Sequence, residues 1–241
     1  VLWFDGDWTY NAGKPTPTRW WTKTDGADLY NYVISLDPNI IVNERVARSF
    51  GLGDFQCPEN EVPEKPLDRQ WETCRTMNNT WGYNASDSAW KSPDTLIREM
   101  VTTVSRDGNY LLNIGPKGDG TVQPEAVHIL NAFGSWMDIF GQSIYGTTRS
   151  PFSTEPAWGV FTKKEGKLYA HVFHWPEDNR LTIPAVSNKL NKVYLMDNHA
   201  KELKYTITGA GNLQINLPAQ PDNQIDQVIE IDMVGLPKTK E

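Results

Sequence analysis

The sequence has no long hydrophobic run, only two cysteines, only four histidines, and fewer basic than acidic residues. No apolar stretch approaches the roughly 20 residues that span a bilayer, so we expect no transmembrane helix. The 23 Lys and Arg residues against 30 Asp and Glu residues give a net charge of −7, which argues against nucleic acid or an anionic membrane surface as a partner. The chain also lacks an initial methionine and a recognisable signal peptide.

The scarcity of cysteine and histidine limits metal and redox chemistry. Cys57 and Cys74 fit either one disulfide or two free thiols, and the sequence leaves both open. The histidines fall in an expected helix or in the C-terminal part of the chain, at positions 128, 171, 174 and 199. No group of His, Cys and Asp residues has the spacing of a metal site, so we expect neither a metal ion nor another cofactor.

Aromatic residues, by contrast, are abundant, with ten Trp, nine Tyr and eight Phe. Flat rings suit the faces of sugars, but they fill a protein core equally well. Their number therefore does not decide between a carbohydrate site and an ordinary interior.

The first part of the chain alternates between predicted strands and predicted helices. Short apolar runs predict strands at 1–5 and 39–43, and further strands are predicted at 71–76 and 109–115. Helical periodicity and capping signals predict helices over 27–36, from Ser92 to a residue before Gly108, and from Pro124 to Gly141. The first helix is expected to bury the face that carries Leu29, Tyr32, Val33 and Leu36. Residues 46–70 are rich in Gly, Pro and charge and are interpreted as a long loop.

This order predicts a parallel sheet with right-handed crossovers. A parallel sheet needs both faces covered or closure into a barrel, and a sheet of this size matches half of an eight-stranded barrel. We therefore predict that residues 1–148 form the second half of a (β/α)8-like barrel, cut just before a strand. Such a chain would expose sheet edges and apolar surface, which favours aggregation or association with the missing N-terminal half.

The pattern of polar and apolar residues changes after Gly146. Polar and apolar residues alternate around Glu165-Gly166 as in a hairpin, and further short alternating runs follow at close spacing. No convincing helix remains. We predict an antiparallel β-sandwich over residues 149–241, with the domain boundary between 146 and 152.

In a barrel of this type, chemistry lies at the carboxyl ends of the strands. Asp5 follows the first predicted strand, Asn43 to Arg45 follow the second, and Asn113 lies at the end of the last. Several acidic residues lie in the loop at 46–70, and Asp7 is expected to stay solvated or to bind neighbouring backbone. Two carboxylates on neighbouring strand ends are what glycoside cleavage requires, one as nucleophile and one as acid/base.

The stretches LWFDGDW, IIVNER, GDFQCPE, WETCRTMNNTWGYN and SRDGNYLLNIGPKGDG follow one another in that order. Together they resemble the retaining α-L-fucosidases of glycoside hydrolase family 29, over residues 1–148 and on into that family's C-terminal β-sandwich. The resemblance implies a hydrolase that releases L-fucose from fucosylated oligosaccharides or glycoconjugates. It also implies an extracellular, periplasmic or lysosomal location.

The resemblance implies roles for residues at the strand ends. Asp5 matches the family's nucleophile, the aspartate of a Trp-X-Asp strand end, and Trp3 matches a tryptophan that lines the fucose site. Arg45 matches the arginine of a Val-Asn-Asp-Arg segment, with Glu44 in place of the usual aspartate. Trp81 matches an aromatic residue that packs on the methyl side of the sugar.

The acid/base residue of the family lies in a variable loop before the motif that corresponds to Trp71-Glu72. Glu59 matches best, because its spacing to Trp71 resembles the family's, but Glu61 and Glu64 are rivals. The remaining fucose contacts of the family, several histidines and a tyrosine, come from the first half of the barrel. We expect that part of the site to lie outside this chain.

Two other functions stay open from the sequence. One is a carbohydrate-binding or structural fragment without catalysis, in which the sandwich, with Trp158 and Trp175, binds the sugar. The other is a glycosidase of different sugar specificity, because many barrels cleave glycosides with the same pair of carboxylates.

Overall fold

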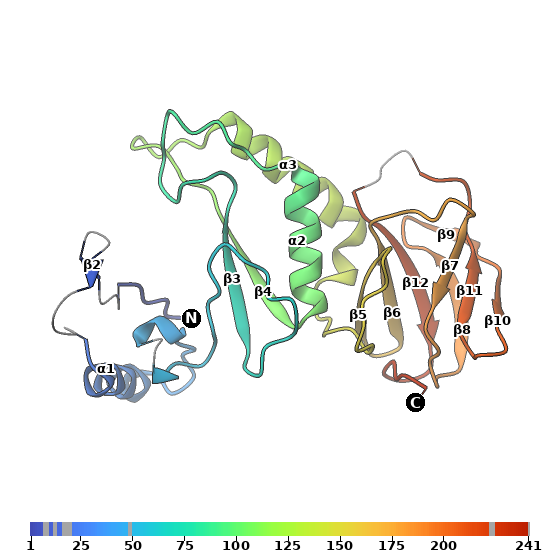
Figure 1. The fold of residues 1–241 in the computed structure, drawn as a ribbon, viewed down its shortest axis with the longest axis horizontal. Helices are drawn as coiled ribbons and strands as arrows, with labels where there is room; N and C mark the ends of the chain where they lie inside the picture. The colour runs from blue at the N-terminus through green and yellow to red at the C-terminus, as the bar shows by residue number, and fades with distance from the viewer. Residues whose placement is uncertain (7–9, 12–13, 16–20, 48–49, 222–224, 241) are drawn as a thin grey trace.

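The computed structural model describes residues 1–6, 10–11, 14–15, 21–47, 50–221 and 225–240. Figure 1 shows an N-terminal part that contains α1, a central pair of strands with helices α2 and α3, and antiparallel sheets at the C-terminal end. Asp7 lies outside the described residues. None of the helices in the described segments combines the length and apolarity that a bilayer crossing needs.

The central strands β3 (Trp71–Thr76) and β4 (Gly108–Asn113) form a parallel ladder. Single parallel bridges continue this arrangement towards the N-terminus, from Leu2 to Val42, Asn43 to Phe55, Gln56 to Trp71 and Glu59 to Cys74. The predicted strand at 71–76 is thus confirmed to the residue, and the strand predicted at 109–115 is confirmed but begins at Gly108 and ends at Asn113. The predicted strands at 1–5 and 39–43 are present only as single bridges.

Residues 55–59 are a correction to the predicted long loop. This segment runs beside β3 on the side away from β4, with Glu72 donating to the carbonyl of Gln56 and Cys74 donating to the carbonyl of Pro58. The segment pairs with β3 through its backbone, and it lacks the apolar run by which a strand is recognised in a sequence. The segment carries Glu59 to the same edge of the sheet as the ends of β3 and β4.

Helix α1 (Lys23–Leu36) begins earlier than predicted because Thr22 and Asp25 form a capping box. Its buried face also differs from the prediction. Val33 is buried and packs with Leu29 and Ile34, whereas Tyr32 and Leu36 are exposed. The helix is longer than predicted, and the side of it that is buried is the side that packs against the segment around Val42 and Val46.

Helices α2 (Pro93–Ser105) and α3 (Pro124–Phe140) join the two ends of the molecule. The capping side chain of Ser92 accepts from Thr95 N at 3.2 Å, as the sequence predicted, and α3 ends at Gly141. In Figure 1, α2 lies between the β3–β4 pair and the first strands of the C-terminal sheets. Ile97 and Val101 of α2 pack with Trp136 and Phe140 of α3 against Tyr169 and its neighbours in the sandwich.

The C-terminal part is an antiparallel β-sandwich. Its larger sheet contains, in spatial order, β5 (Gly159–Lys164), β6 (Lys167–Val172), β12 (Gln227–Met233), β8 (Leu190–Leu195) and β9 (Asn198–Glu202). Its smaller sheet contains β10 (Tyr205–Ile207), β11 (Leu213–Asn216) and β7 (Arg180–Ile183). The main core lies between the sheets, where Ile229 and Ile231 of β12 meet Leu181 and Ile215.

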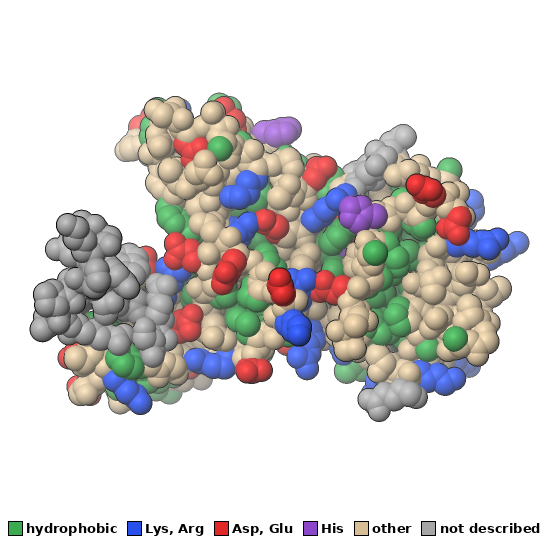
Figure 2. Space-filling view, viewed as in Figure 1, with side chains coloured by type: hydrophobic (Ala, Val, Ile, Leu, Met, Phe, Trp, Pro, Cys, Tyr) green, Lys and Arg blue, Asp and Glu red, His purple; other side chains and the backbone are tan. Residues whose placement is uncertain are grey.

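Strand β12 is buried along nearly its whole length because the larger sheet is covered on both faces. One face packs on the smaller sheet, and the other, through Val160, Tyr169 and Val228, packs on α2 and α3. The remaining short elements are β1 (Tyr10–Asn11), β2 (Lys14–Pro15), η1 (Glu44–Val46) and η3 (Gly141–Ser143). In Figure 2, acidic and basic side chains lie interspersed on the face shown, over the central part of the molecule.

Candidate active site

A hollow of about 550 Å³ opens where the carboxyl ends of the parallel segments meet. It is lined by Trp3, Asp5, Arg45, Glu59, Cys74, Trp81, Leu111, Leu112, Asn113 and Ile114. Parallel segments bring their carboxyl ends to one edge of a sheet, so residues far apart in the sequence gather here. The structure thus brings together all five residues singled out as the main site: Trp3, Asp5, Arg45, Glu59 and Trp81.

Arg45 lies at the centre of the polar part of the hollow. Its side chain is only 4% exposed, while those of Asp5 and Glu59 are 45% and 40% exposed. Nη1 donates to Asp5 Oδ1 at 2.9 Å, and Nη2 donates to Glu59 Oε2 at 2.8 Å. One guanidinium group therefore holds both carboxylates on the same side of the hollow.

The surroundings of Arg45 raise its pKa and so keep the side chain charged. Burial alone lowers the pKa of Arg45, but the hydrogen bond to Asp5 and the nearby Cys74, Glu59 and Asp5 raise that pKa above its ordinary value. Its Nη2 also lies 3.5 Å from Cys74 Sγ.

Asn43 fixes the position of the backbone next to Asp5. The Asn43 carboxamide accepts from Phe4 N at 2.8 Å and donates to Phe4 O at 2.9 Å, which locks together the ends of two adjacent parallel segments. Glu44, the departure from the family's usual aspartate, accepts from Cys57 N at 2.8 Å. Its longer side chain therefore anchors the segment that carries Glu59.

The two tryptophans form the walls, and each is oriented by a hydrogen bond. Trp3 Nε1 donates to Glu72 Oε1 at 3.0 Å, and the Arg45 guanidinium carbon lies 4.6 Å from the centroid of the Trp3 ring. Trp81 Nε1 donates to Glu59 Oε1 at 3.2 Å, so Glu59 is held from two sides. Asn113 at the end of β4 donates to the carbonyl of Trp81 at 2.7 Å.

The rival carboxylates lie elsewhere in the described structure. Glu61 and Glu64 are exposed and neither lines the hollow, and Glu64 lies instead beside Arg106 in a depression near the start of the sandwich. The two cysteines are free thiols and both are buried, which answers the question that the sequence left open. Burial raises the pKa of the Cys57 thiol to about 12, and burial also raises the pKa of Cys74.

Asn43, Glu72 and Cys74 are the residues that the sequence reasoning did not assign to the site. Asn43 had the right position, directly after a predicted strand, but an amide there has no distinct chemical signature. Glu72 and Cys74 lie on β3 with a residue between them, so they point to the same side of that strand. Alternate residues of a strand point to the same side, so the alternation along β3 is the signal that could have assigned Glu72 and Cys74 to the site. Among the residues that the structure describes, no group of His, Cys, Asp or Glu could hold a metal ion.

Comparison with known proteins gives consistent matches along the chain. The family model described as Alpha-L-fucosidase matches residues 1–142, and the model described as Alpha-L-fucosidase C-terminal domain matches residues 150–231. The tissue alpha-L-fucosidase of Bos taurus is 32% identical over 230 residues, covering 92% of this chain and 47% of that protein. The tissue alpha-L-fucosidase of Homo sapiens is 30% identical over 239 residues, covering 93% and 49%.

A solved structure shows the same relationship. Alpha-L-fucosidase isoenzyme 1 from Paenibacillus thiaminolyticus superimposes with a TM-score of 0.83 at 28% identity, covering 96% of this chain and 57% of that chain. The architecture is accordingly a partial barrel followed by a β-sandwich. The chain spans about half the length of the curated relatives that it matches.

Proposed function

Because this chain belongs to the α-L-fucosidase family, we propose that it carries both reacting carboxylates of a retaining enzyme that releases L-fucose from α-L-fucosides. The observation that supports this assignment is the buried Arg45, which contacts Asp5 and Glu59 with separate nitrogens at the mouth of one hollow. Retaining glycosidases need two carboxyl groups close together, about 5–5.5 Å apart. A single guanidinium that binds both favours such a short separation.

In the proposed first step, an Asp5 oxygen attacks the anomeric carbon as the bond from that carbon to the leaving oxygen breaks. Glu59 gives its proton to the leaving oxygen, so the alcohol departs neutral and a fucosyl ester of Asp5 remains. In the second step, Glu59 takes a proton from water, the water oxygen bonds to the anomeric carbon, and the ester bond breaks. Two inversions give L-fucose with net retention.

The surroundings of the two carboxylates fix where both groups lie in the hollow. Arg45 binds one oxygen of Asp5, which orients the other oxygen and stabilises the carboxylate that departs in the second step. Trp81 and Arg45 hold the two oxygens of Glu59. The apolar surface of Trp3, Trp81 and Leu111 is a suitable wall for the methyl group of fucose, the feature that distinguishes it from galactose.

The proposal extends to the rest of the enzyme. We place the second half of a (β/α)8-like barrel in residues 1–148 and the sandwich domain in residues 149–241, and we assign the remaining fucose contacts to an N-terminal half of the barrel. The complete enzyme would act on fucosylated oligosaccharides or glycoconjugates in an extracellular, periplasmic or lysosomal compartment.

The test uses the complete enzyme and an aryl α-L-fucoside. Asp5→Ala is expected to lower kcat by at least about 10³-fold, the scale expected when a nucleophile is removed. Glu59→Ala is expected to lose about 10²–10⁴-fold on substrates with poor leaving groups, as for loss of a general acid. With an activated leaving group, added azide should restore its rate and give a fucosyl azide.

Glu61→Ala and Glu64→Ala are matched controls, because they remove the same side chain from the same part of the chain. Both should retain activity near that of the parent. Substantial activity in Asp5→Ala would overturn the nucleophile, and azide rescue of Glu61→Ala or Glu64→Ala would move the acid/base role. A panel of aryl glycosides tests the sugar, and a preference for galactoside over fucoside would contradict the proposed specificity.

A further inference from the structure

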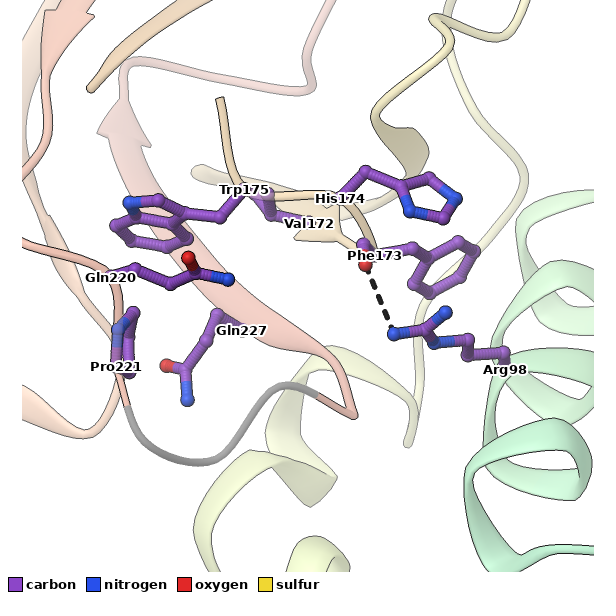
Figure 3. Close-up of a pocket in the computed structure, with 8 residues that line it drawn as sticks. All are labelled: Arg98, Val172, Phe173, His174, Trp175, Gln220, Pro221 and Gln227. Atoms are coloured by element: carbon purple, nitrogen blue, oxygen red, sulfur yellow. Dashed lines mark hydrogen bonds between the residues drawn. The ribbon is translucent and has the colours of Figure 1, made fainter. Parts of the chain in front are cut away.

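A second hollow, of about 260 Å³, lies at the edge of the sandwich beside α2 (Figure 3). It shares no lining residue with the hollow that contains Asp5 and Glu59. The residues that line it come from α2, from the end of β6 and the residues after it, and from the chain around β12. Its volume is just below the usual range of small-ligand pockets, about 300–1,000 Å³.

One wall of this hollow is held rigidly. Arg98 Nε donates to Ile225 O at 2.6 Å, Arg98 Nη2 donates to Phe173 O at 3.0 Å, and the guanidinium carbon lies 5.5 Å from the centroid of the Phe173 ring. Figure 3 shows the His174 imidazole, the Phe173 ring and the Arg98 guanidinium one below another. The backbone N–H groups of Phe173 and His174 both donate to Trp158 O, so the wall cannot shift without breaking several hydrogen bonds.

The opposite wall presents an aromatic face beside a carboxamide. Trp175 packs partly against the sandwich core, and its Nε1 donates to Asn179 Oδ1 at 3.2 Å, which fixes the plane of the indole. The side chain of Gln220 lies next to this ring in Figure 3, and Gln220 is exposed. The indole is therefore held in place, and the exposed carboxamide of Gln220 lines the same hollow.

This combination fits a saccharide better than the other small ligands. A sugar has a C–H face that packs on an aromatic ring, and hydroxyl groups that both donate to and accept from a carboxamide. An apolar ligand would bury the polar side chains of His174 and Gln220 without partners, which is costly. Arg98 is the one permanently charged residue among the eight that line the hollow, and its nitrogens already donate to two carbonyls, so an anion would find little compensation.

We propose that this hollow is an auxiliary binding site for a neutral saccharide, with Trp175 as the stacking platform and Gln220 and His174 as the polar contacts. It would hold a sugar unit of a larger glycan at a place separate from bond cleavage. The proposal does not depend on the roles of Asp5 and Glu59, and it can be tested without an activity assay.

The test is a titration of the 241-residue chain, followed by the indole N–H signals of tryptophan in a ¹⁵N-labelled sample. The probes are L-fucose, lactose, N-acetyllactosamine, cellobiose and mannobiose, with inorganic phosphate as the anion. We expect at least one saccharide to shift the Trp175 signal, with a Kd near 1 mM, which corresponds to about −4 kcal/mol. The signal is assigned by its absence in Trp175→Phe.

The variants separate this hollow from the candidate active site. Trp175→Ala and Gln220→Ala should each raise the Kd for the best saccharide by about tenfold or more. Gln220 is exposed, so its variant remains informative if Trp175→Ala does not fold. The control Trp81→Ala alters the other hollow and should leave the Kd that is read from the Trp175 signal unchanged. No shift of the Trp175 signal with any saccharide at about ten times that Kd, a response to phosphate alone, or loss of binding in Trp81→Ala would each overturn the proposal.

Discussion

Arg45 is a buried cation whose charge is balanced by two carboxylates on different segments of the chain. Removing one partner of a buried ion pair usually costs far more than the pair itself contributes to folding, because it leaves an uncompensated charge. The arrangement therefore makes Asp5, Arg45 and Glu59 interdependent. Lysine cannot reproduce it, because an ammonium group is a single point charge without the planar fork of donors.

We predict that Arg45→Lys lowers kcat/KM of the complete enzyme by about 10²–10³-fold, the scale observed when one preorganised donor to reacting groups is lost. Steady-state kinetics with an aryl α-L-fucoside measure this loss. Arg106→Lys is the matched control, because Arg106 pairs with Glu155 near the surface, away from the hollow. Equal activity of the two variants would contradict the proposed role of Arg45.

The buried thiols give a prediction about pH. Because burial raises the pKa of Cys57 to about 12, only about one molecule in 10⁴ carries the thiolate at pH 8. Cys57 and Cys74 should both resist iodoacetamide in the folded chain at pH 8 and react readily in urea, as mass spectrometry would show. Rapid labelling of either cysteine in the folded state would contradict this.

The sign of the pH effect on stability follows from the same shift. The unfolded thiol ionises near pH 8.5, whereas folded Cys57 keeps its proton up to about pH 12. The unfolded state therefore gains stability as the pH rises through this window, and the folded chain loses it. Cys57→Ser should flatten the decline in urea midpoint between pH 8.5 and 10, and an unchanged slope would speak against Cys57 as its source.

At the scale of single elements, helix α2 contributes to the stability of both parts of the molecule, because it packs on β4 and on the sandwich. Its first turn depends on Ser92, whose hydroxyl accepts from Thr95 N, and on Pro93, which needs no backbone partner there. We predict that Ser92→Ala costs about 1 kcal/mol of unfolding free energy, the usual value of such a cap. Urea denaturation measures it.

Two further variants test whether the loss in Ser92→Ala comes from the missing cap. Ser92→Asp restores a capping oxygen and should recover most of the loss. Ser153→Ala removes a hydroxyl from an exposed loop position and should change the free energy by less than about 0.5 kcal/mol. A loss in Ser153→Ala as large as that in Ser92→Ala would mean that the cap is not the cause.

At the scale of the whole molecule, the helices and the sandwich share one hydrophobic cluster. Trp136 of α3 is buried there, packs with Phe140 at a ring-centroid distance of 5.3 Å, and donates from Nε1 to Asp226 O at 3.2 Å. The fully buried His171 and Asp226 pair at 2.7 Å lies beside it. The apolar cluster and the hydrogen bond from Trp136 to Asp226 O tie the C-terminal sheets to the barrel-like part.

We predict that Trp136→Ala lowers the unfolding free energy by about 3–5 kcal/mol, as for other large-to-small changes in a core. Urea transitions followed by circular dichroism and by fluorescence should coincide in the parent chain, which would indicate one cooperative unit. Tyr145→Ala is the control, because Tyr145 is 71% exposed. An unchanged midpoint in Trp136→Ala would show that the junction contributes little.

The sequence predicted those elements whose own residues carry a strong local signal. Helix α2, with its serine and proline at the start, and strands β3 and β4 match the expectation closely. The hairpin around Glu165-Gly166 is confirmed as well. In the same domain, β9 ends at Glu202 and β10 begins at Tyr205 in the other sheet, with the buried Leu203 between them.

The sequence by itself also determined the candidate residues, because Asp5, Arg45, Glu59 and the two tryptophans lie in motifs that can be recognised locally. Only the tertiary structure decided that Glu59, rather than Glu61 or Glu64, lies beside Arg45, since the pairing of residues 55–59 with β3 is made by the backbone. It also decided the roles of Asn43 and Glu72 and the existence of the hollow beside Trp175. Local propensities act over a few residues, whereas a site is built by contacts between segments tens of residues apart.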